Sequence, residues 1–348
     1  MNEKKKKCGV IGSGGIARRR TIPEGIVPAE NAVLHAVFDI DKKLNQEIAL
    51  EFGAVPARSI EYLLESGIDA VYVASPANAH LQHVMACAEA GKHVLCEKPL
   101  GMTVAEAEQM IEACRDAGVV LGTALMMRFH AQHREALQMV REDRIGKPVF
   151  GRAQLSCWYP PMEGAWRQDP LTGGGGSLMD MGSHCLDLLE MYLGEIDTVS
   201  CLISNNVHDY ESEDSAILSL KFRSGALAAV DTFFCIPDNS RKNLLELYGS
   251  KGIILAKGTI GQGDSGEMMA FLEEDTAGYD AQQSREESDA LTIDPVPENT
   301  YLSEIVEFSN ALLENREPLN NAAIGLQSQK VLEACYRSAA SGTAEKVL

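Results

Sequence analysis

Residues 7–17 read KCGVIGSGGIA, and this stretch decides the fold of the first part of the chain. Its first five residues predict a short strand, and the glycine-rich remainder predicts a tight turn into a helix. In such a turn Gly12 permits the sharp bend, Gly14 lets the backbone approach a pyrophosphate, and Ala17 lets the helix pack closely on the sheet. The stretch therefore predicts the first strand, loop and helix of a dinucleotide-binding domain.

The next strand-like run, residues 33–38, ends at Asp39. That position lies about 20 residues beyond the glycine loop, where a carboxylate accepts a hydrogen bond from the ribose 2′-hydroxyl. A carboxylate would repel a 2′-phosphate, so NAD is expected in preference to NADP. Arg18, Arg19 and Arg20 leave an alternative open, because they could hold a phosphate instead of turning outward. No Gly-Lys-Ser/Thr follows the glycines, which disfavours a P-loop.

Strands and helices alternate through the first third of the chain, which is typical of a parallel sheet with crossover helices. Further strands are predicted over residues 70–74, 92–96 and 119–124, and helices over 41–52, capped by Asp41, and 103–117, capped by Thr103. From residue 148 onward, strand-like segments 149–158, 216–222, 226–234 and 243–248 follow one another with little helix. We therefore predict a doubly wound α/β Rossmann domain over residues 1–127. Residues 128–348 are predicted to form an α+β domain with a large open, mainly antiparallel sheet.

Charged residues follow the strand at 92–96 and a run of four glycines at 173–176. Lys98 comes directly after that strand, and the carboxyl ends of parallel strands are where open α/β sheets bind ligands. Asp180 and His184 follow the glycines and lie one turn apart on one face of a predicted helix. This set supplies a cation, a base that titrates near neutrality, and a carboxylate that could orient the imidazole or hold a substrate hydroxyl.

Four segments, in order, carry a resemblance to a known family. They are Gly12-Ser13-Gly14-Gly15-Ile16-Ala17, Ser75-Pro76-Ala77-Asn78-Ala79-His80, Glu97-Lys98-Pro99, and Gly176 to Asp187 with its Asp180 and His184. Along nearly its whole length the chain resembles the glucose-fructose oxidoreductase, inositol dehydrogenase and MocA-like (Gfo/Idh/MocA) family of NAD(P)-dependent sugar dehydrogenases. The resemblance implies a cis peptide before Pro99 and an open sheet that forms a homodimer or homotetramer interface.

The resemblance also implies hydride transfer between nicotinamide and a secondary hydroxyl of a sugar, polyol or glycoside. Lys98 would polarise the reacting oxygen, His184 would act as acid and base, and Asp180 would complete the catalytic set. The expected cofactor-binding residues are Gly12, Ser13, Gly14, Gly15, Ile16, Asp39, Ser75, Pro76, Asn78, His80, Glu97 and Lys98. For Asn78, a helix N-cap is the structural alternative.

Substrate contacts are expected from side chains that suit a carbohydrate, because aromatic faces pack on sugar CH groups and fixed donors bind hydroxyls. The expected residues are Lys98, Arg128, Trp158, Tyr159, Trp166, Arg167, Asp180 and His184. Packing in the core or at an interface is the open alternative for the two tryptophans.

Two other functions remain open from the sequence. A glycosidase or lyase could keep NAD tightly bound and use transient oxidation, and a regulator could sense NAD without catalysis. The intact Lys98, Asp180 and His184 weigh against the regulator. Net NADH production separates a dehydrogenase from an enzyme that uses transient oxidation, because the latter returns its cofactor to the starting state.

Composition excludes several classes of partner. The chain has 348 residues and a net charge of −19, which argues against nucleic acid, since phosphate binding needs clustered Lys and Arg. It has no apolar stretch near the ~20 residues that span a bilayer, so we expect a cytoplasmic protein with no membrane partner. Its nine cysteines are an odd number and are scattered, which favours reduced thiols.

No metal is expected. His80, His83 and Cys87 have helical spacing, but the chain contains no CxxC pair of the kind that zinc sites use. The acidic stretch from Leu272 to Asp289 is predicted to be a solvated loop or hairpin arm. Two amphipathic helices are expected near the end of the chain, over residues 301–314 and 322–338.

Overall fold

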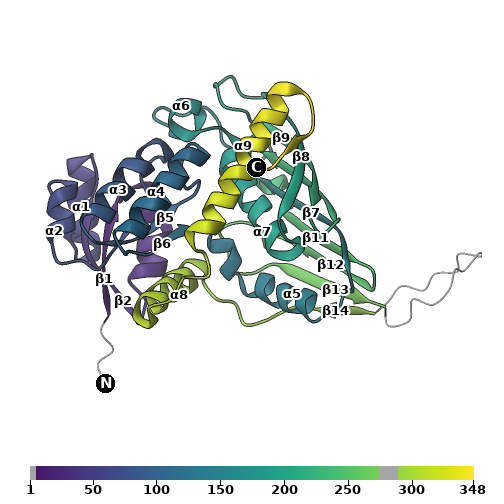
Figure 1. Ribbon diagram of the computed structural model, residues 1–348, viewed down its shortest axis with the longest axis horizontal. Coiled ribbons are helices and arrows are strands. Elements are labelled where there is room, and N and C mark those ends of the chain that lie inside the picture. Colours follow the sequence, from purple (N-terminus) through teal and green to yellow (C-terminus); the bar gives the residue numbers. More distant parts are fainter. Residues whose placement is uncertain (1–4, 274–288) are drawn as a thin grey trace, which may run out of the picture.

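The computed structural model describes residues 5–273 and 289–348. In this part of the chain two β-sheets lie side by side, and helices flank both of them (Figure 1). The smaller sheet belongs to the first third of the chain and the larger sheet to the rest. This arrangement confirms the predicted pairing of a Rossmann domain with a second, sheet-rich domain.

The first sheet is parallel throughout and has six strands among the described residues, in the order β3-β2-β1-β4-β5-β6. The strands are β1 (Lys6–Ile11), β2 (Ala32–Phe38), β3 (Val55–Pro56), β4 (Ala70–Val73), β5 (His93–Glu97) and β6 (Leu121–Ala124). The strand order reverses between β1 and β4, and the carboxyl ends of strands at such a reversal form the usual ligand crevice of doubly wound sheets.

Helices join these strands and cover both faces of the sheet (Figure 1). They are η1 (Ala17–Ile26), α1 (Lys42–Phe52), α2 (Ile60–Glu65), η2 (Ala77–Ala79), α3 (His80–Glu89) and α4 (Val104–Asp116). Asp41 caps α1 by accepting hydrogen bonds from the backbone N–H groups of Lys43 and Leu44, and Thr103 caps α4 in the same way. Both predicted caps are confirmed.

The second sheet is mostly antiparallel, with one parallel pair, β7 and β10. Its order over the described residues is β14-β13-β12-β11-β7-β10-β9-β8-β15. The strands are β7 (Pro148–Ser156), β8 (Ile196–Ser204), β9 (Ser215–Phe222), β10 (Leu227–Phe233), β11 (Leu244–Gly249), β12 (Gly252–Lys257), β13 (Glu267–Leu272), β14 (Ala290–Thr292) and β15 (Glu345–Lys346). Strands β13 and β14 pair with each other on either side of the predicted loop or arm, whose residues 274–288 lie outside the described residues.

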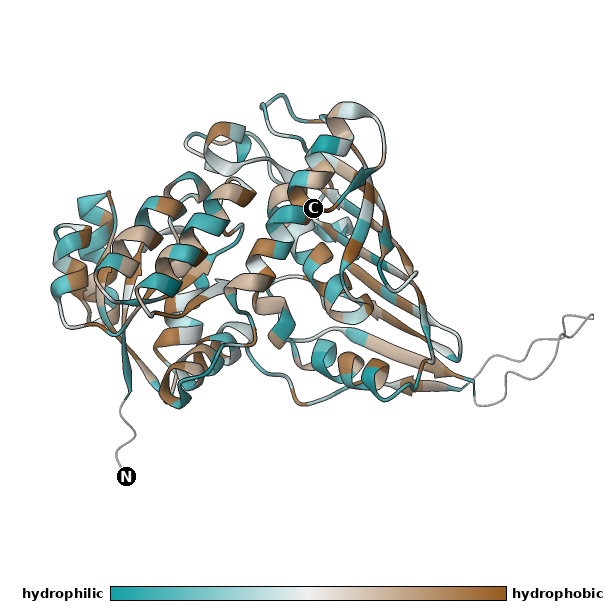
Figure 2. Cartoon of the chain, in the orientation of Figure 1, coloured by the Kyte–Doolittle hydropathy of each residue, from teal (hydrophilic) through white to brown (hydrophobic). Residues whose placement is uncertain are grey.

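One face of the larger sheet is covered by helices, and the other is open (Figure 1). The helices after β6 are η3 (Met126–Phe129), α5 (Ala131–Arg141), η4 (Trp166–Gln168), α6 (Pro170–Gly173), η5 (Leu178–Gly182), α7 (Ser183–Leu193), η6 (Asp238–Ser240), α8 (Thr300–Glu314) and α9 (Ala322–Ser341). Hydrophobic and hydrophilic residues alternate along the strands (Figure 2), as expected of a sheet that buries a single face. The buried face and helices α7 and α9 share one hydrophobic core.

Helix α8 returns to the first domain. Its side chains Ile305, Phe308 and Leu312 belong to the hydrophobic core that also contains Val10 and Ile22. The predicted domain boundary after residue 127 stays a prediction, but this part of the second segment completes the core of the first. Among the described residues, no helix combines the length and apolar character needed to cross a membrane.

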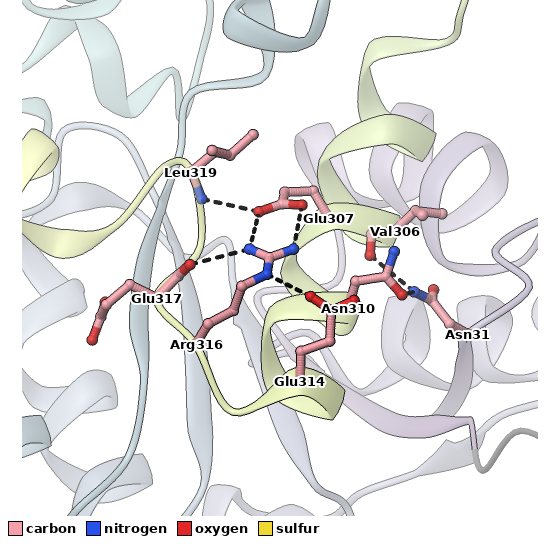
Figure 3. Close-up of polar contacts among 8 residues, drawn as sticks. All are labelled: Asn31, Val306, Glu307, Asn310, Glu314, Arg316, Glu317 and Leu319. Carbon is pink, nitrogen blue, oxygen red and sulfur yellow. Dashed lines mark hydrogen bonds and ion pairs between the residues drawn. The ribbon is translucent and has the colours of Figure 1, made fainter.

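Asn31 and Arg316 make polar contacts with α8 (Figure 3). The buried Asn31 donates to the carbonyl oxygen of Val306 over 2.9 Å and to the side-chain oxygen of Asn310 over 2.8 Å. Beyond the end of the helix, the Arg316 guanidinium bonds both carboxylate oxygens of Glu307, over 2.6 and 2.9 Å. The Asn31 bonds tie α8 to the segment before β2, whereas the Arg316 pair holds the loop after α8 against the helix.

Candidate functional site

A cavity of about 540 Å³ lies where the two domains meet, at the carboxyl ends of the parallel strands. Glu97 and Lys98 line it from the end of β5, and Asp180 and His184 line it from η5 and α7. The other lining residues are Ile16, Arg19, Arg20, Ala124, Met126, Met127, Leu155, Ser156, Cys157, Arg167, Met181, Asp238, Arg241, Asn243, Gly261, Gln262, Gly263 and Tyr301. The structure thus brings the expected catalytic residues of both domains together.

The loop after β1 has the form that a dinucleotide requires. Gly12 has a φ of 78°, and a Cβ atom there would lie 2.5 Å from the backbone nitrogen of Ser75, so no other residue fits. Gly15 faces open space, with no atom within 4 Å of its would-be Cβ. The hydroxyl of Ser13 is buried and has no hydrogen-bond partner among the described residues. An open loop with an unsatisfied buried hydroxyl fits an incoming pyrophosphate.

Asp39 lies beside this loop, where the sequence placed it. One of its carboxylate oxygens accepts from the backbone N–H of Gly14 over 3.0 Å. Of the three arginines that follow the loop, Arg18 pairs with Glu51 on α1 over 2.9 Å, and Arg19 and Arg20 line the cavity. A carboxylate thus lies against the glycine loop, and two arginines of η1 lie beside the cavity.

The loop after β4 is held from behind by His80. This side chain is 1% exposed, and its two ring nitrogens lie 2.9 Å from the carbonyl oxygens of Ser75 and Pro99. The expectation that His80 contacts the cofactor needs correction, because the imidazole is enclosed and joins two loops. Pro76 is the N-cap of the short helix η2, and Asn78 lies within this helix and is exposed, so the N-cap alternative for Asn78 is wrong.

Lys98 is tied to Asp180 by two contacts. Its ammonium group donates to the carboxylate over 2.7 Å and to the backbone carbonyl oxygen of the same residue over 2.6 Å. Arg167 places its Nε 2.9 Å from the same carboxylate oxygen. Burial alone would raise the pKa of Asp180, but the two cations hold it well below its usual range. The bond between Lys98 and Pro99 is cis, as the resemblance implies.

His184 is held in its neutral form. Burial lowers its pKa to about 3, and the positive charge of Lys98 adds to this effect. Its Nδ1 is buried without a hydrogen-bond partner in the described part of the chain, so Nε2 is the nitrogen available to the cavity. The idea that Asp180 orients this imidazole is not supported, because the Asp180 carboxylate is engaged by Lys98 and Arg167.

Two acidic side chains interact at the end of β5: Glu97, which lines the cavity, and the buried Glu304. Glu97 accepts from the Tyr72 hydroxyl, which in turn accepts from Thr21 over 3.0 Å. Burial raises the pKa of Glu97 and, with the added negative charge of Glu97, that of Glu304 on α8. Sequence reasoning missed Tyr72 and Glu304, because neither follows a recognisable motif and Glu304 is more than 200 residues away from Glu97 along the chain.

Arg128 is not among the residues that line this cavity. Its guanidinium bonds the buried carboxylate of Asp187, with Nε 2.8 and 2.9 Å from the two oxygens, and it borders a separate cavity between α5 and α8. The expectation that Arg128 contacts substrate is therefore corrected to an internal ion pair. No sequence motif indicated the ion pair between Arg128 and Asp187, since the two residues are far apart in the chain.

The aromatic side chains that were expected to contact substrate lie beside Arg167 or away from the cavity. The Trp166 ring lies under the Arg167 guanidinium at 4.2 Å, and the Tyr159 hydroxyl bonds that same group. Trp158 meets the His208 ring edge-on at 4.9 Å. None of the three aromatic residues lines the cavity, whereas Arg167 does.

The far wall of the cavity comes from loops that no motif indicated. Asp238, Arg241 and Asn243 lie between β10 and β11, and Gln262 lies between β12 and β13. Within residues 5–273 and 289–348, no cluster of three or more His, Cys, Asp or Glu side chains could hold a metal ion.

The fold and the cavity define a two-domain protein of the dinucleotide-binding oxidoreductase class. The family description "Oxidoreductase family, NAD-binding Rossmann fold" matches residues 6–125, and "GFO/IDH/MocA C-terminal domain" matches residues 133–255. The chain belongs to this GFO/IDH/MocA oxidoreductase family, as its motifs predicted.

Known relatives span nearly the whole chain. It is 29% identical over 345 residues to 1,5-anhydro-D-fructose reductase of Ensifer adhaerens, with 98% of each chain covered. It is 31% identical over 287 residues to myo-inositol 2-dehydrogenase of Thermotoga maritima, covering 76% of this chain and 82% of the relative. The crystal structure of aldose-aldose oxidoreductase from Caulobacter crescentus superposes with a TM-score of 0.87 at 26% identity, covering 99% of this chain and 100% of the other.

Proposed function

We propose that this protein is an NAD-dependent dehydrogenase that oxidises a secondary hydroxyl of a sugar, polyol or glycoside, in a reversible reaction. The observation that carries the proposal is the meeting of Lys98 and His184, from different domains, in one cavity beside a dinucleotide loop. The glycine loop and Asp39 would hold NAD, and Glu97 would lie nearest its nicotinamide ribose. Bound NAD supplies the hydride acceptor.

The side chains divide the remaining chemistry. Lys98 donates to the reacting oxygen, and its positive charge stabilises the developing alkoxide; hydrogen bonds to charged groups contribute about 1.5 to 3 kcal/mol. His184 takes the hydroxyl proton on Nε2, and burial keeps this base unprotonated over the ordinary pH range. Asp180 holds Lys98 by its carboxylate and its carbonyl oxygen, so the ammonium stays aimed at the cavity.

Preference for NAD over NADP is part of the proposal. A 2′-phosphate near Asp39 would meet a negative charge, and Arg18 on η1 is engaged by Glu51. Assembly through the open sheet face is also proposed, as a homodimer or homotetramer. On that face the cross-strand neighbours Leu202 and Ile217 are 66% and 54% exposed. Light scattering on purified protein should report a mass of two or four chains.

The test is the absorbance of NADH while purified protein meets free sugars, polyols, sugar acids and glycosides, with NAD and NADP in parallel. We expect a rise with NAD on one substrate class. Lys98→Met should lower kcat by about 10- to 100-fold, the loss of one hydrogen bond to a charged group. Lys92→Met is the matched control, because Lys92 donates to the carbonyl oxygen of Ile68, outside the site.

Two results would redirect the proposal. A fully active Lys98→Met protein would remove the assigned role of the ammonium group. Silence across the panel from protein that retains bound NAD would favour a lyase or glycosidase that oxidises its substrate only transiently. Product analysis by mass spectrometry with the same glycosides then distinguishes that enzyme from a regulator, which would convert none of them.

A further inference from the structure

We infer that Glu213 is a positioning residue for the catalytic helix, which begins at η5 and carries Asp180 and His184. Glu213 lies in the segment between β8 and β9, far from these residues in the sequence. It neither lines the cavity nor belongs to any motif that the sequence indicated. The inference rests on the proposed function for its kinetic consequence, but its structural consequence can be measured without a substrate.

Glu213 accepts hydrogen bonds from three consecutive backbone N–H groups at the start of the helix. One carboxylate oxygen accepts from Gly176 and from Leu178, each over 2.9 Å, and the backbone carbonyl oxygen accepts from Ser177 over 3.0 Å. The first N–H groups of a helix have no partner within the helix, so an external acceptor fixes where the helix starts. Here a single residue supplies the acceptors for all three.

The glycine run is explained by the closeness of this contact. A Cβ atom at Gly176 would lie 2.0 Å from the carbonyl oxygen of Glu213, and one at Gly175 would lie 1.8 Å from the Tyr336 hydroxyl. Real Cβ atoms do not approach other atoms so closely, hence only glycine lets the loop reach the carboxylate. The Tyr336 hydroxyl, on α9, donates to the same Glu213 oxygen over 3.1 Å.

Glu213 itself is held rigidly. It is 5% exposed, and the next residue, Asp214, accepts three successive backbone N–H groups, those of Asn206, Val207 and His208, over 2.8 to 2.9 Å. A buried acceptor on a braced loop cannot follow the helix if the helix moves. Glu213, which we call the anchor, therefore sets the position of the helix rather than adapting to it.

The anchor connects to the catalytic cation by a short path. Gly176, whose N–H is held by Glu213, accepts the N–H of Asp180 over 2.9 Å on its carbonyl oxygen. Asp180 then holds Lys98 by two contacts. A π-helical segment at 178–182 separates this point from α7, and such segments often occur at functional sites. Loss of the anchor should therefore loosen Lys98 before it disturbs the NAD loop in the other domain.

The substrate-independent test is the rate at which acetic anhydride acetylates Lys98, read by peptide mass spectrometry against Lys92 in the same sample. An ammonium held in an ion pair reacts slowly, so Glu213→Ala should speed acetylation of Lys98 about tenfold. Glu213→Gln keeps an acceptor oxygen and should stay within about twofold of the unmodified protein. Glu190→Ala is the matched control, because Glu190 is a half-buried carboxylate at the other end of the same helix that accepts from Ile196 N–H.

Kinetics test the same inference where a substrate is found. Glu213→Ala should lower kcat by about 10²-fold, the typical cost of a misplacement near 1 Å, with KM for NAD within about twofold. Glu190→Ala should lower the melting temperature without this loss of kcat. The inference fails if both alanine variants give the same acetylation rate of Lys98, or if Glu213→Gln is no better than Glu213→Ala.

If Glu213→Ala does not fold, two variants that each lack one tyrosine hydroxyl test the inference instead. Tyr336→Phe removes a donor to Glu213, whereas Tyr192→Phe removes a buried hydroxyl on α7 that donates to His133 over 3.1 Å. Faster acetylation of Lys98 in the first variant alone supports the anchor, and equal rates overturn it. If no substrate is ever oxidised but acetylation changes as expected, the anchor stands and the dehydrogenase proposal falls.

Discussion

Replacing Arg128 with alanine should destabilise the fold rather than weaken substrate binding. The guanidinium lies against Asp187 with three contacts of 2.7 to 2.9 Å, and the Asp187 side chain is only 3% exposed. Removing one partner of such a buried pair leaves an uncompensated charge and typically costs about 3–5 kcal/mol. By comparison, Arg134→Ala breaks an exposed pair with Glu298 and should cost under about 1 kcal/mol.

The loss of folding stability caused by Arg128→Ala should also depend on pH. Burial raises the pKa of Asp187, and the charge of Arg128 opposes that rise. Without Arg128 the folded carboxyl has a pKa above its unfolded value, so the variant keeps its stability at low pH and loses it as pH rises through the folded pKa. The loss relative to the unmodified protein should therefore be greater at pH 8 than at pH 5.

Urea unfolding followed by circular dichroism at these two pH values measures both effects. Arg128→Ala combined with Asp187→Ala should recover much of the stability, because no buried charge is then left alone. The reasoning is refuted if Arg128→Ala is as stable as Arg134→Ala. It is also refuted if the variant keeps full stability and loses activity, which would return Arg128 to the substrate site.

Three further outcomes are expected. Asp39→Ala should raise KM for NAD and narrow the preference for NAD over NADP by about tenfold, because one hydrogen bond to a charged group is lost. An unchanged ratio of kcat/KM for the two cofactors would contradict the ribose assignment. Burial lowers the pKa of His184 to about 3, below its unfolded value, so the neutral imidazole adds stability that is present above about pH 6.5 and lost as pH falls toward 3. His184→Gln should therefore reduce the loss of stability on the acid side of a stability–pH profile. An unchanged loss argues against burial of the imidazole. Asn31→Ala removes the two bonds that the Asn31 side chain makes to α8 and should cost about 1–3 kcal/mol in thermal or urea unfolding. A neutral effect would mean that α8 does not depend on these two bonds.

Local patterns predicted the parts of the molecule that depend on neighbouring residues. The glycine loop, the caps at Asp41 and Thr103, and the place of Lys98 at a strand end all follow from short stretches, and the structure has them where expected. The cavity then brings Lys98 and His184 together because the second domain places its helix over the carboxyl ends of the first sheet.

Partnerships over long sequence distances could not be predicted. Asp180, one helical turn from His184, was expected to orient its imidazole or to hold a substrate hydroxyl, but two cations from other elements bind its carboxylate. Arg128 was expected at the substrate because it follows the last parallel strand, whereas a buried carboxylate on α7 attracts it inward. Glu213 carries no local signal, since its role exists only when the glycine loop folds against it.

The return of α8 to the first domain has a consequence for how the molecule assembles. During synthesis the Rossmann strands emerge early, but Ile305, Phe308 and Leu312, which complete their core, emerge only after most of the larger sheet. Until α8 is made, the strands of the first sheet expose the apolar surface that these three side chains cover. A fragment of residues 1–127 would keep its NAD-binding motif and lack the side chains that seal it, so the two domains should gain and lose their structure together.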